Sequence, residues 1–206
     1  MKLKKILNEI LTERKQVGTV YHFTDLYSSI KIVETDILKS ARVTKNIDGE
    51  TVSTTRNKNF VNHRDGETLQ ISGGDIGFEL DGNALSARYK VMPYDDTFDQ
   101  SDMEYDVDDK EQFGDEMEEL WFGNALKRDG GFTNLKKYVT AIIITKKFKN
   151  KLINSPNDIG NNLINKAKTD LLFKFPTLYD EDVSAIDKLN QIKKFFTNNG
   201  FTVKIE

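Results

Sequence analysis

The strongest constraint on the fold is the run Val139–Thr145, in which apolar and β-branched residues follow one another almost without interruption. A strand of this composition has apolar residues on both faces, so it predicts an internal strand of a sheet whose two faces are covered. A chain of 206 residues, 37% of them hydrophobic, is long enough to bury such a core within one domain.

The rest of the chain alternates strand and helix signals without an internal repeat, which predicts one mixed α+β domain over residues 1–206. Further strands are expected at residues 19–24, 51–55, 76–80 and 201–205, with extended pieces at 36–40 and 88–93. Helices are expected at residues 25–34, 158–168 and 183–198, with one helical turn at 83–86 and a linker or helical turn at 134–138. An amphipathic N-terminal helix is expected at residues 1–15, within an N-terminal segment 1–17.

Composition excludes several classes of function. The net charge of −3 argues against a protein that binds polyanions with its whole surface. The chain has no cysteine and only two histidines, far apart in sequence, so no disulfide framework and no metal site are expected. Its longest apolar run, 141–144, is far too short to cross a membrane, and no secretory signal is evident. We therefore expect a soluble, cytoplasmic protein with no membrane partner; the oligomeric state stays open.

The stretch from Asp95 to Glu119 is unusually acidic, with thirteen acidic residues among twenty-five and Lys110 as its only base. Such a charge density repels itself, so residues 95–112 are expected to form a mobile loop. The end of the stretch runs directly into Leu120 and Trp121, so some of its carboxylates are expected near the core.

The first candidate for chemistry is His22, which lies in the β-prone run Thr19–Thr24 just before the helix expected at residues 25–34. A histidine at such a strand end can reach a ligand. The alternative is a half-buried histidine whose ring is satisfied by a neighbouring carbonyl.

The second candidate is the threonine-rich run Thr51–Thr55, followed directly by Arg56. Hydroxyl groups at a strand end with a guanidinium beyond them suit a phosphate or a ribose. Equally, such a run is typical of an edge strand with one solvent-exposed face.

The order of these motifs resembles that of the ADP-ribosyltransferase superfamily. His22 and Thr24 are similar to its His-Gly-Thr strand, although Phe23 stands where glycine is usual, and Ser53-Thr54-Thr55 is similar to its Ser-Thr-Ser strand. Glu116-Met117-Glu118, or the same pattern shifted by one to Glu119, resembles its catalytic Glu-x-Glu turn. Residues 21–24, 53–57, 80–95 and 118–122 together also resemble small bacteriophage proteins of this class.

The resemblance implies an ADP-ribosyltransferase-like fold: a split mixed β-sheet core with an N-terminal amphipathic helix and C-terminal helices. It implies a phage-encoded mono-ADP-ribosyltransferase that uses NAD as substrate, needs no metal, and modifies a protein or nucleic acid in the host cytoplasm. The NAD-binding residues would be Tyr21, His22, Phe23, Thr24, Ser53, Thr54, Thr55 and Arg56. The catalytic carboxylate would be Glu118, with Glu116 orienting the nucleophile, or else Glu119.

Two other functions stay open. The same scaffold could be catalytically inactive and use its acidic loop to occupy a basic host protein. A related enzyme that uses NAD to remove a 2′-phosphate from RNA would need several basic residues, and near the motifs the sequence offers chiefly Arg56 and Arg88.

Overall fold

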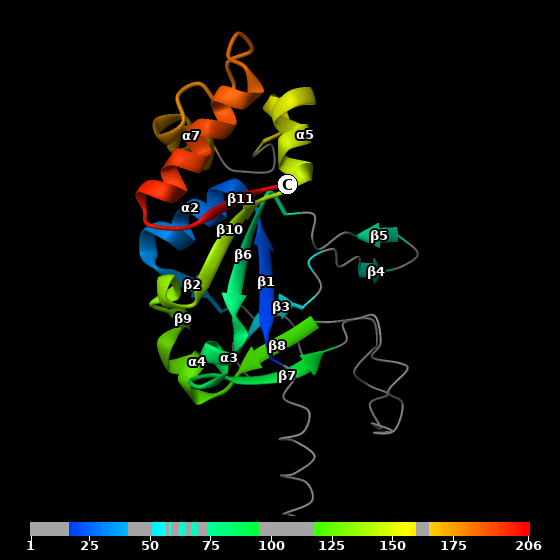
Figure 1. The fold of residues 1–206 in the computed structure, drawn as a ribbon, viewed down its shortest axis with the longest axis vertical. Coiled ribbons are helices and arrows are strands. Elements are labelled where there is room, and N and C mark those ends of the chain that lie inside the picture. The colour runs from blue at the N-terminus through cyan, green and yellow to red at the C-terminus, as the bar shows by residue number, and fades with distance from the viewer. Residues whose placement is uncertain are drawn as a thin grey trace, which may run out of the picture.

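The computed structural model describes residues 17–40, 51–56, 58, 62–64, 67–69, 74–94, 118–159 and 165–206 (Figure 1). The helix expected at residues 1–15, the acidic loop expected at residues 95–112, and Glu116 lie outside the described residues.

Seven strands form the main sheet: β1 (Thr19–Thr24), β3 (Val52–Thr55), β6 (Ile76–Asp81), β7 (Lys90–Tyr94), β8 (Glu118–Phe122), β10 (Val139–Ile144) and β11 (Val203–Ile205). Their order across the sheet is β11-β10-β6-β1-β3-β8-β7. Strands β10 and β11 run parallel, and the other neighbouring pairs are antiparallel. The expected mixed α+β fold class is thereby confirmed.

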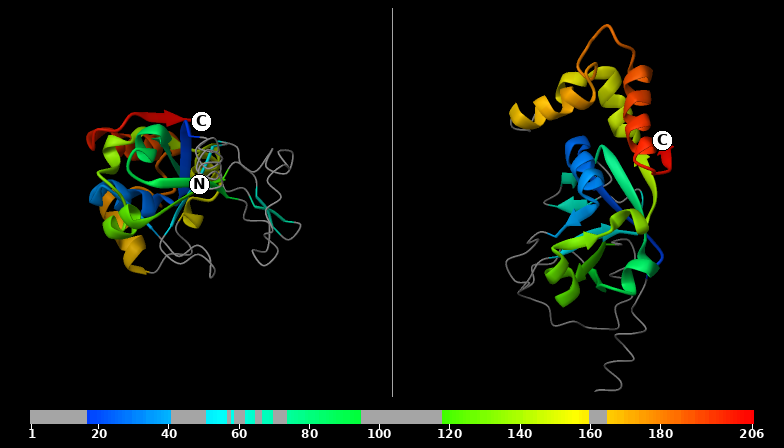
Figure 2. Two further views of the ribbon diagram at one scale, coloured as in Figure 1. Left: turned by 90° about the horizontal axis from the view of Figure 1, so that it is seen from below. Right: turned by 90° about the vertical axis from the view of Figure 1, so that its left-hand side faces the viewer.

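The helices are α2 (Leu26–Thr35), α3 (Gly82–Ser86), α4 (Asn124–Asp129), α5 (Lys146–Asn154), α6 (Asn165–Lys174) and α7 (Ala185–Asn198). Two 3-10 turns are η3 (Leu135–Lys137) and η4 (Pro156–Asp158). Two short ladders pair β2 (Ile37–Lys39) with β9 (Gly131–Thr133), and β4 (Asn62–Arg64) with β5 (Glu67–Leu69). Helices α5 and α7 gather at one end of the molecule, and α3 and α4 at the other (Figures 1 and 2).

The expectation for the apolar run 139–145 is confirmed. Strand β10 lies between β6 and β11, and Ala141, Ile142, Ile143 and Ile144 are all buried. Ile142 and Ile144 pack with Phe78 and Ile76 of β6, to which they are paired in register, and all four are fully buried. Within the described part of the chain, no helix is both long and apolar enough to span a bilayer.

Helix α2 follows β1 through a side-chain cap. The carboxylate of Asp25 accepts hydrogen bonds from the backbone N–H of Ser28 at 2.9 Å and from its hydroxyl at 2.6 Å. These bonds satisfy a donor that the first helical turn leaves without a partner. Leu26, Ile30 and Val33 then face the core, as their spacing predicts.

The interpretation of Thr51–Thr55 as an edge strand is wrong. Strand β3 lies inside the sheet, between β1 and β8, and Thr51, Thr54 and Thr55 are buried. Threonine is tolerated there because its hydroxyl can be satisfied by neighbouring groups, as the Trp121 indole does for Thr54.

The helix expected at residues 158–168 is also misplaced. Pro156 opens the 3-10 turn η4, and the described helix α6 extends six residues further along the chain, to Lys174. Its buried residues, Ala167 and Leu171, lie four positions apart, and Phe175 continues the same spacing just beyond the helix. Residues 160–164 of the expected helix lie outside the described residues.

Candidate functional site

The three strands that carry the sequence motifs are neighbours in the sheet, in the order β1-β3-β8. Tyr21 of β1 lies opposite Thr55 of β3, and Thr55 lies opposite Glu118 of β8. The register thus joins three stretches that are far apart in the sequence into one row across the sheet. The candidate site is built on this row and on the residues of β1 that follow it towards α2, His22, Phe23 and Thr24.

Strands β1 and β3 part beyond this row. Among the described residues, β1 pairs with β6 over six residue pairs, from Thr19 to Thr24, but with β3 through the single pair Tyr21 and Thr55. Continued pairing would have placed Phe23 opposite Ser53. The sheet therefore splits beside His22, Phe23 and Thr24.

The imidazole of His22 bridges the split, with its Nδ1 3.1 Å from the carbonyl oxygen of Ser53. A carbonyl oxygen only accepts, so Nδ1 carries the proton of the neutral ring and Nε2 is left as an acceptor. Burial lowers the pKa of His22, although the hydrogen bond to Ser53 offsets part of this effect. A half-buried ring bonded to a carbonyl is what the structural interpretation of this histidine predicts. Nε2 takes no part in the bond to Ser53, so the arrangement is also compatible with ligand binding.

A pH dependence of stability follows from the lowered pKa. The unfolded chain takes up a proton on His22 near its ordinary pKa of 6.5, while the folded protein does so only at lower pH. The contribution of neutral His22 is therefore complete above pH 6.5 and is lost as the pH falls towards the folded-state pKa. We expect urea unfolding at about pH 7.5 and about pH 5.5 to show a larger loss of stability for the wild type than for His22→Asn, which does not titrate. An equal loss in both proteins would contradict the burial of this ring.

Phe23 occupies the position where the resemblance expects glycine, and its side chain lies away from the split. The ring stacks with that of Tyr21 at a centroid distance of 6.3 Å, on the face opposite His22. It also covers Gly77 of β6, where any Cβ would collide with it.

The backbone of Phe23 is directed towards the split. The N–H of Gly82 donates to the carbonyl of Gly18 at 2.8 Å, so these two residues form a hydrogen-bonded pair directly before the first β1–β6 pair, Thr19 and Asp81. Because hydrogen-bonding residues alternate in an antiparallel strand, even-numbered residues of β1 bond to β6, and Tyr21 and Phe23 turn their N–H and C=O groups towards β3. A planar amide of a ligand could bond to both backbone groups of Phe23.

The remaining predicted residues lie in β1 and β3 or directly after β3. Thr54 is buried, and its hydroxyl accepts the indole N–H of the fully buried Trp121 at 2.8 Å, which ties β3 to β8. Thr55 is buried, whereas Ser53, Thr24 and Arg56 are half-buried, and Arg56 directly follows β3. The sequence did not indicate the bond between Thr54 and Trp121, because strand pairing decides which hydroxyl meets the indole.

Glu118 and Glu119 lie within β8 itself, so two of the three predicted acidic positions belong to a strand and not to a turn before it. Glu119 pairs with Thr54 and Glu118 with Thr55. In the described part of the chain, no group of three or more acidic or histidine side chains is arranged to hold a metal ion.

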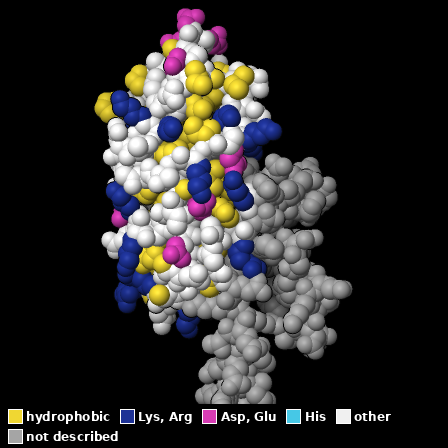
Figure 3. Space-filling view, in the orientation of Figure 1, with side chains coloured by type: hydrophobic (Ala, Val, Ile, Leu, Met, Phe, Trp, Pro, Cys, Tyr) yellow, Lys and Arg dark blue, Asp and Glu magenta, His cyan; other side chains and the backbone are white. Residues whose placement is uncertain are grey.

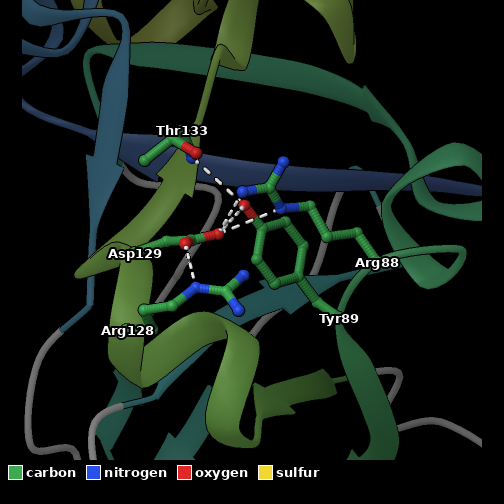
Figure 4. A network of polar contacts seen from close by, with 5 residues as sticks. All are labelled: Arg88, Tyr89, Arg128, Asp129 and Thr133. Carbon is green, nitrogen blue, oxygen red and sulfur yellow. Dashed lines mark hydrogen bonds and ion pairs between the residues drawn. The ribbon is translucent and has the colours of Figure 1, made fainter.

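Arg88, the second basic residue considered for phosphate binding, belongs to a separate network (Figure 4). Its Nε and terminal nitrogen donate to Asp129 Oδ2 at 3.0 and 2.5 Å, and the Tyr89 hydroxyl also donates to this oxygen at 3.3 Å. The N–H of Thr133 donates to the Tyr89 hydroxyl in turn. The Arg88 guanidinium lowers the pKa of Asp129, which stays ionised and keeps Arg88 engaged.

Basic and acidic side chains are intermixed on the face seen in Figure 3. Lys204 of β11 pairs with Glu79 of β6 at 2.7 Å, and Lys58, which follows β3, pairs with Glu206. Among the described residues beside the motif strands, the cation is chiefly Arg56, since Arg88 is bound to Asp129, whereas RNA 2′-phosphate chemistry needs several cations around one phosphate.

Comparisons of the chain with protein-family models, with curated proteins and with solved structures give no significant match.

Proposed function

We propose that this protein is a mono-ADP-ribosyltransferase that binds NAD where β1 and β3 part and transfers ADP-ribose to a macromolecule. The observation that carries the proposal is the adjacency of β1, β3 and β8, because each carries one of the three motifs that resemble that superfamily. Without that adjacency, the motifs could not serve one ligand.

The backbone at the split suits the nicotinamide end of NAD. A carboxamide offers one acceptor and two donors in a plane, and the N–H and C=O of Phe23 are complementary to it. This interaction needs no side chain at position 23, so phenylalanine is compatible with the role, with its ring over Gly77.

His22 suits a ribose. Its Nε2 is an acceptor while Nδ1 holds Ser53, and the lowered pKa keeps the ring neutral near pH 7. A ribose hydroxyl could donate to Nε2, which would fix the sugar relative to the nicotinamide. The half-buried Arg56 at the end of β3 could meet the pyrophosphate.

The reaction would proceed as follows. The bond between C1′ of the ribose and the nicotinamide nitrogen breaks, and its electron pair leaves with nicotinamide. Positive charge develops on the ribose, and a carboxylate from β8 stabilises it more in the transition state than in the ground state. The acceptor's lone pair then bonds to C1′, and its proton passes to solvent.

The test is an assay of the purified full chain with NAD labelled in the adenylate. We expect nicotinamide release and transfer of label to material in a bacterial lysate, with protease and nuclease digestion identifying the class of acceptor. A protein that shows neither nicotinamide release nor, by calorimetry, NAD binding would contradict the proposal.

A further inference from the structure

We infer that Glu119, and not Glu118, is the catalytic carboxylate; this inference rests on the proposed function. Glu118 and Glu119 are adjacent in β8, and adjacent residues of a strand belong to opposite faces of the sheet. A single ligand at the split can therefore use one of these two positions, and the register identifies which.

The register places position 119 on the His22 face. Tyr21, Thr55 and position 118 form one row across β1, β3 and β8. The next residues, His22 on β1 and Thr54 on β3, belong to the other face, and Thr54 pairs with position 119.

An independent contact fixes this register. Trp121 lies two residues after position 119 and thus on the same face, and its indole N–H donates to the Thr54 hydroxyl at 2.8 Å. Both side chains are buried, so this bond excludes competing water. A slip of one residue between β3 and β8 would exchange the two faces and break it.

The two faces differ in what they offer a dinucleotide. On the face of position 118, the rings of Tyr21 and Phe23 stack on each other, and Phe23 covers Gly77. On the face of position 119, His22 provides the Nε2 acceptor for a ribose hydroxyl. The carboxylate that stabilises charge on the ribose must act on the same sugar that His22 holds, so it comes from position 119.

The experiment compares Glu119→Gln with Glu118→Gln in the full chain, each measured for nicotinamide release and for NAD binding. Glutamine keeps the size and polarity of glutamate but loses the charge. We expect Glu119→Gln to lower kcat by at least ~100-fold, the effect of removing one group that stabilises a charged transition state. Its affinity for NAD should change by no more than a few fold, because this interaction strengthens mainly in the transition state.

Glu118→Gln should retain kcat within a few fold of the wild type. A loss in Glu118→Gln as large as that in Glu119→Gln would overturn the assignment. Retained NAD binding shows that a variant is folded, and if Glu119→Gln fails to bind, Glu119→Asp replaces it with the same expected loss of kcat. A wild type that does not release nicotinamide would instead contradict the proposed function, which separates the two failures.

Discussion

Replacing His22 with alanine is expected to lower kcat/KM for nicotinamide release by at least ~100-fold, the scale associated with misplacing a bound substrate by about 1 Å. The substitution removes two contacts at once. One is the bond from Nδ1 to the Ser53 carbonyl across the split, and the other is the contact that we propose between Nε2 and a ribose hydroxyl. Steady-state release of nicotinamide from NAD measures the effect.

Two further variants separate binding from folding. In His22→Asn, the side-chain amide nitrogen takes the place of Nδ1, so the bond to Ser53 is kept while the Nε2 acceptor is lost. We expect this variant to be nearly as stable as the wild type at neutral pH and yet nearly inactive. Full activity in His22→Asn would mean that the histidine only ties β1 to β3.

The matched control is Val20→Ala. Val20 lies on the same face of β1, two residues from His22, and is fully buried. Its truncation should lower the free energy of unfolding by about 2 kcal/mol, mainly through lost packing. Nicotinamide release should stay within a few fold of the wild type at a temperature where the variant is folded.

Replacing Gly131 with alanine is expected to lower the free energy of unfolding by about 3–5 kcal/mol. This figure is the sum of two costs, the strain of a left-handed backbone and the overpacking of the new methyl group against a rigid neighbour. Gly131 has φ +138°, and a Cβ there would overlap the carbonyl oxygen of Leu38. The two strands cannot move apart to relieve this overlap without breaking the β2–β9 ladder. The loss is a large fraction of the stability of an ordinary domain. Chemical denaturation followed by circular dichroism measures it.

The adjacent glycine provides the control. Gly130 also has a positive φ, +69°, but a Cβ there would meet no atom within 4 Å. Gly130→Ala should therefore cost only about 1 kcal/mol, the strain of a non-glycine residue in the left-handed region. Equal losses in the two variants would show that backbone conformation, and not contact with Leu38, limits this ladder.

The damage from Gly131→Ala should reach the candidate site. The next residue, Phe132, is fully buried and packs edge-on against Trp121, with ring centroids 5.4 Å apart. Trp121 in turn holds Thr54. A displaced β9 is therefore expected to loosen the junction of β3 and β8 beneath the site, and indole fluorescence would report this change.

Local sequence patterns correctly predicted those helices and strands whose burial follows from their own residues alone. Val139–Thr145 has apolar residues on both faces, and Asp25 caps a helix with a regular apolar stripe, so both were located correctly. The threonine-rich strand β3 was open to two interpretations, because its burial depends on Trp121, which lies 67 positions away in the sequence. Helix α6 was misplaced because its buried stripe, Ala167 and Leu171, runs beyond the end of the expected helix.

The residues of the candidate site could be predicted from sequence motifs, but their arrangement in space could not. The sequence placed His22 on a strand, but the split that exposes the Phe23 backbone depends on how far β1 and β3 stay paired. The role of Gly77 was missed for a similar reason, since only the β1–β6 register brings it beneath the Phe23 ring. The choice between adjacent glutamates likewise depends on the register of β3 against β8, two strands that are far apart in the sequence.

A crystal structure of the protein with NAD, or with a non-cleavable analogue of it, would show whether the dinucleotide binds where β1 and β3 part. We expect the nicotinamide carboxamide on the backbone N–H and C=O of Phe23, with a ribose hydroxyl within hydrogen-bonding distance of His22 Nε2. NAD bound away from the junction of β1 and β3 would contradict this expectation, as would crystals that take up no NAD at ~10 mM, tenfold above the usual range of KM.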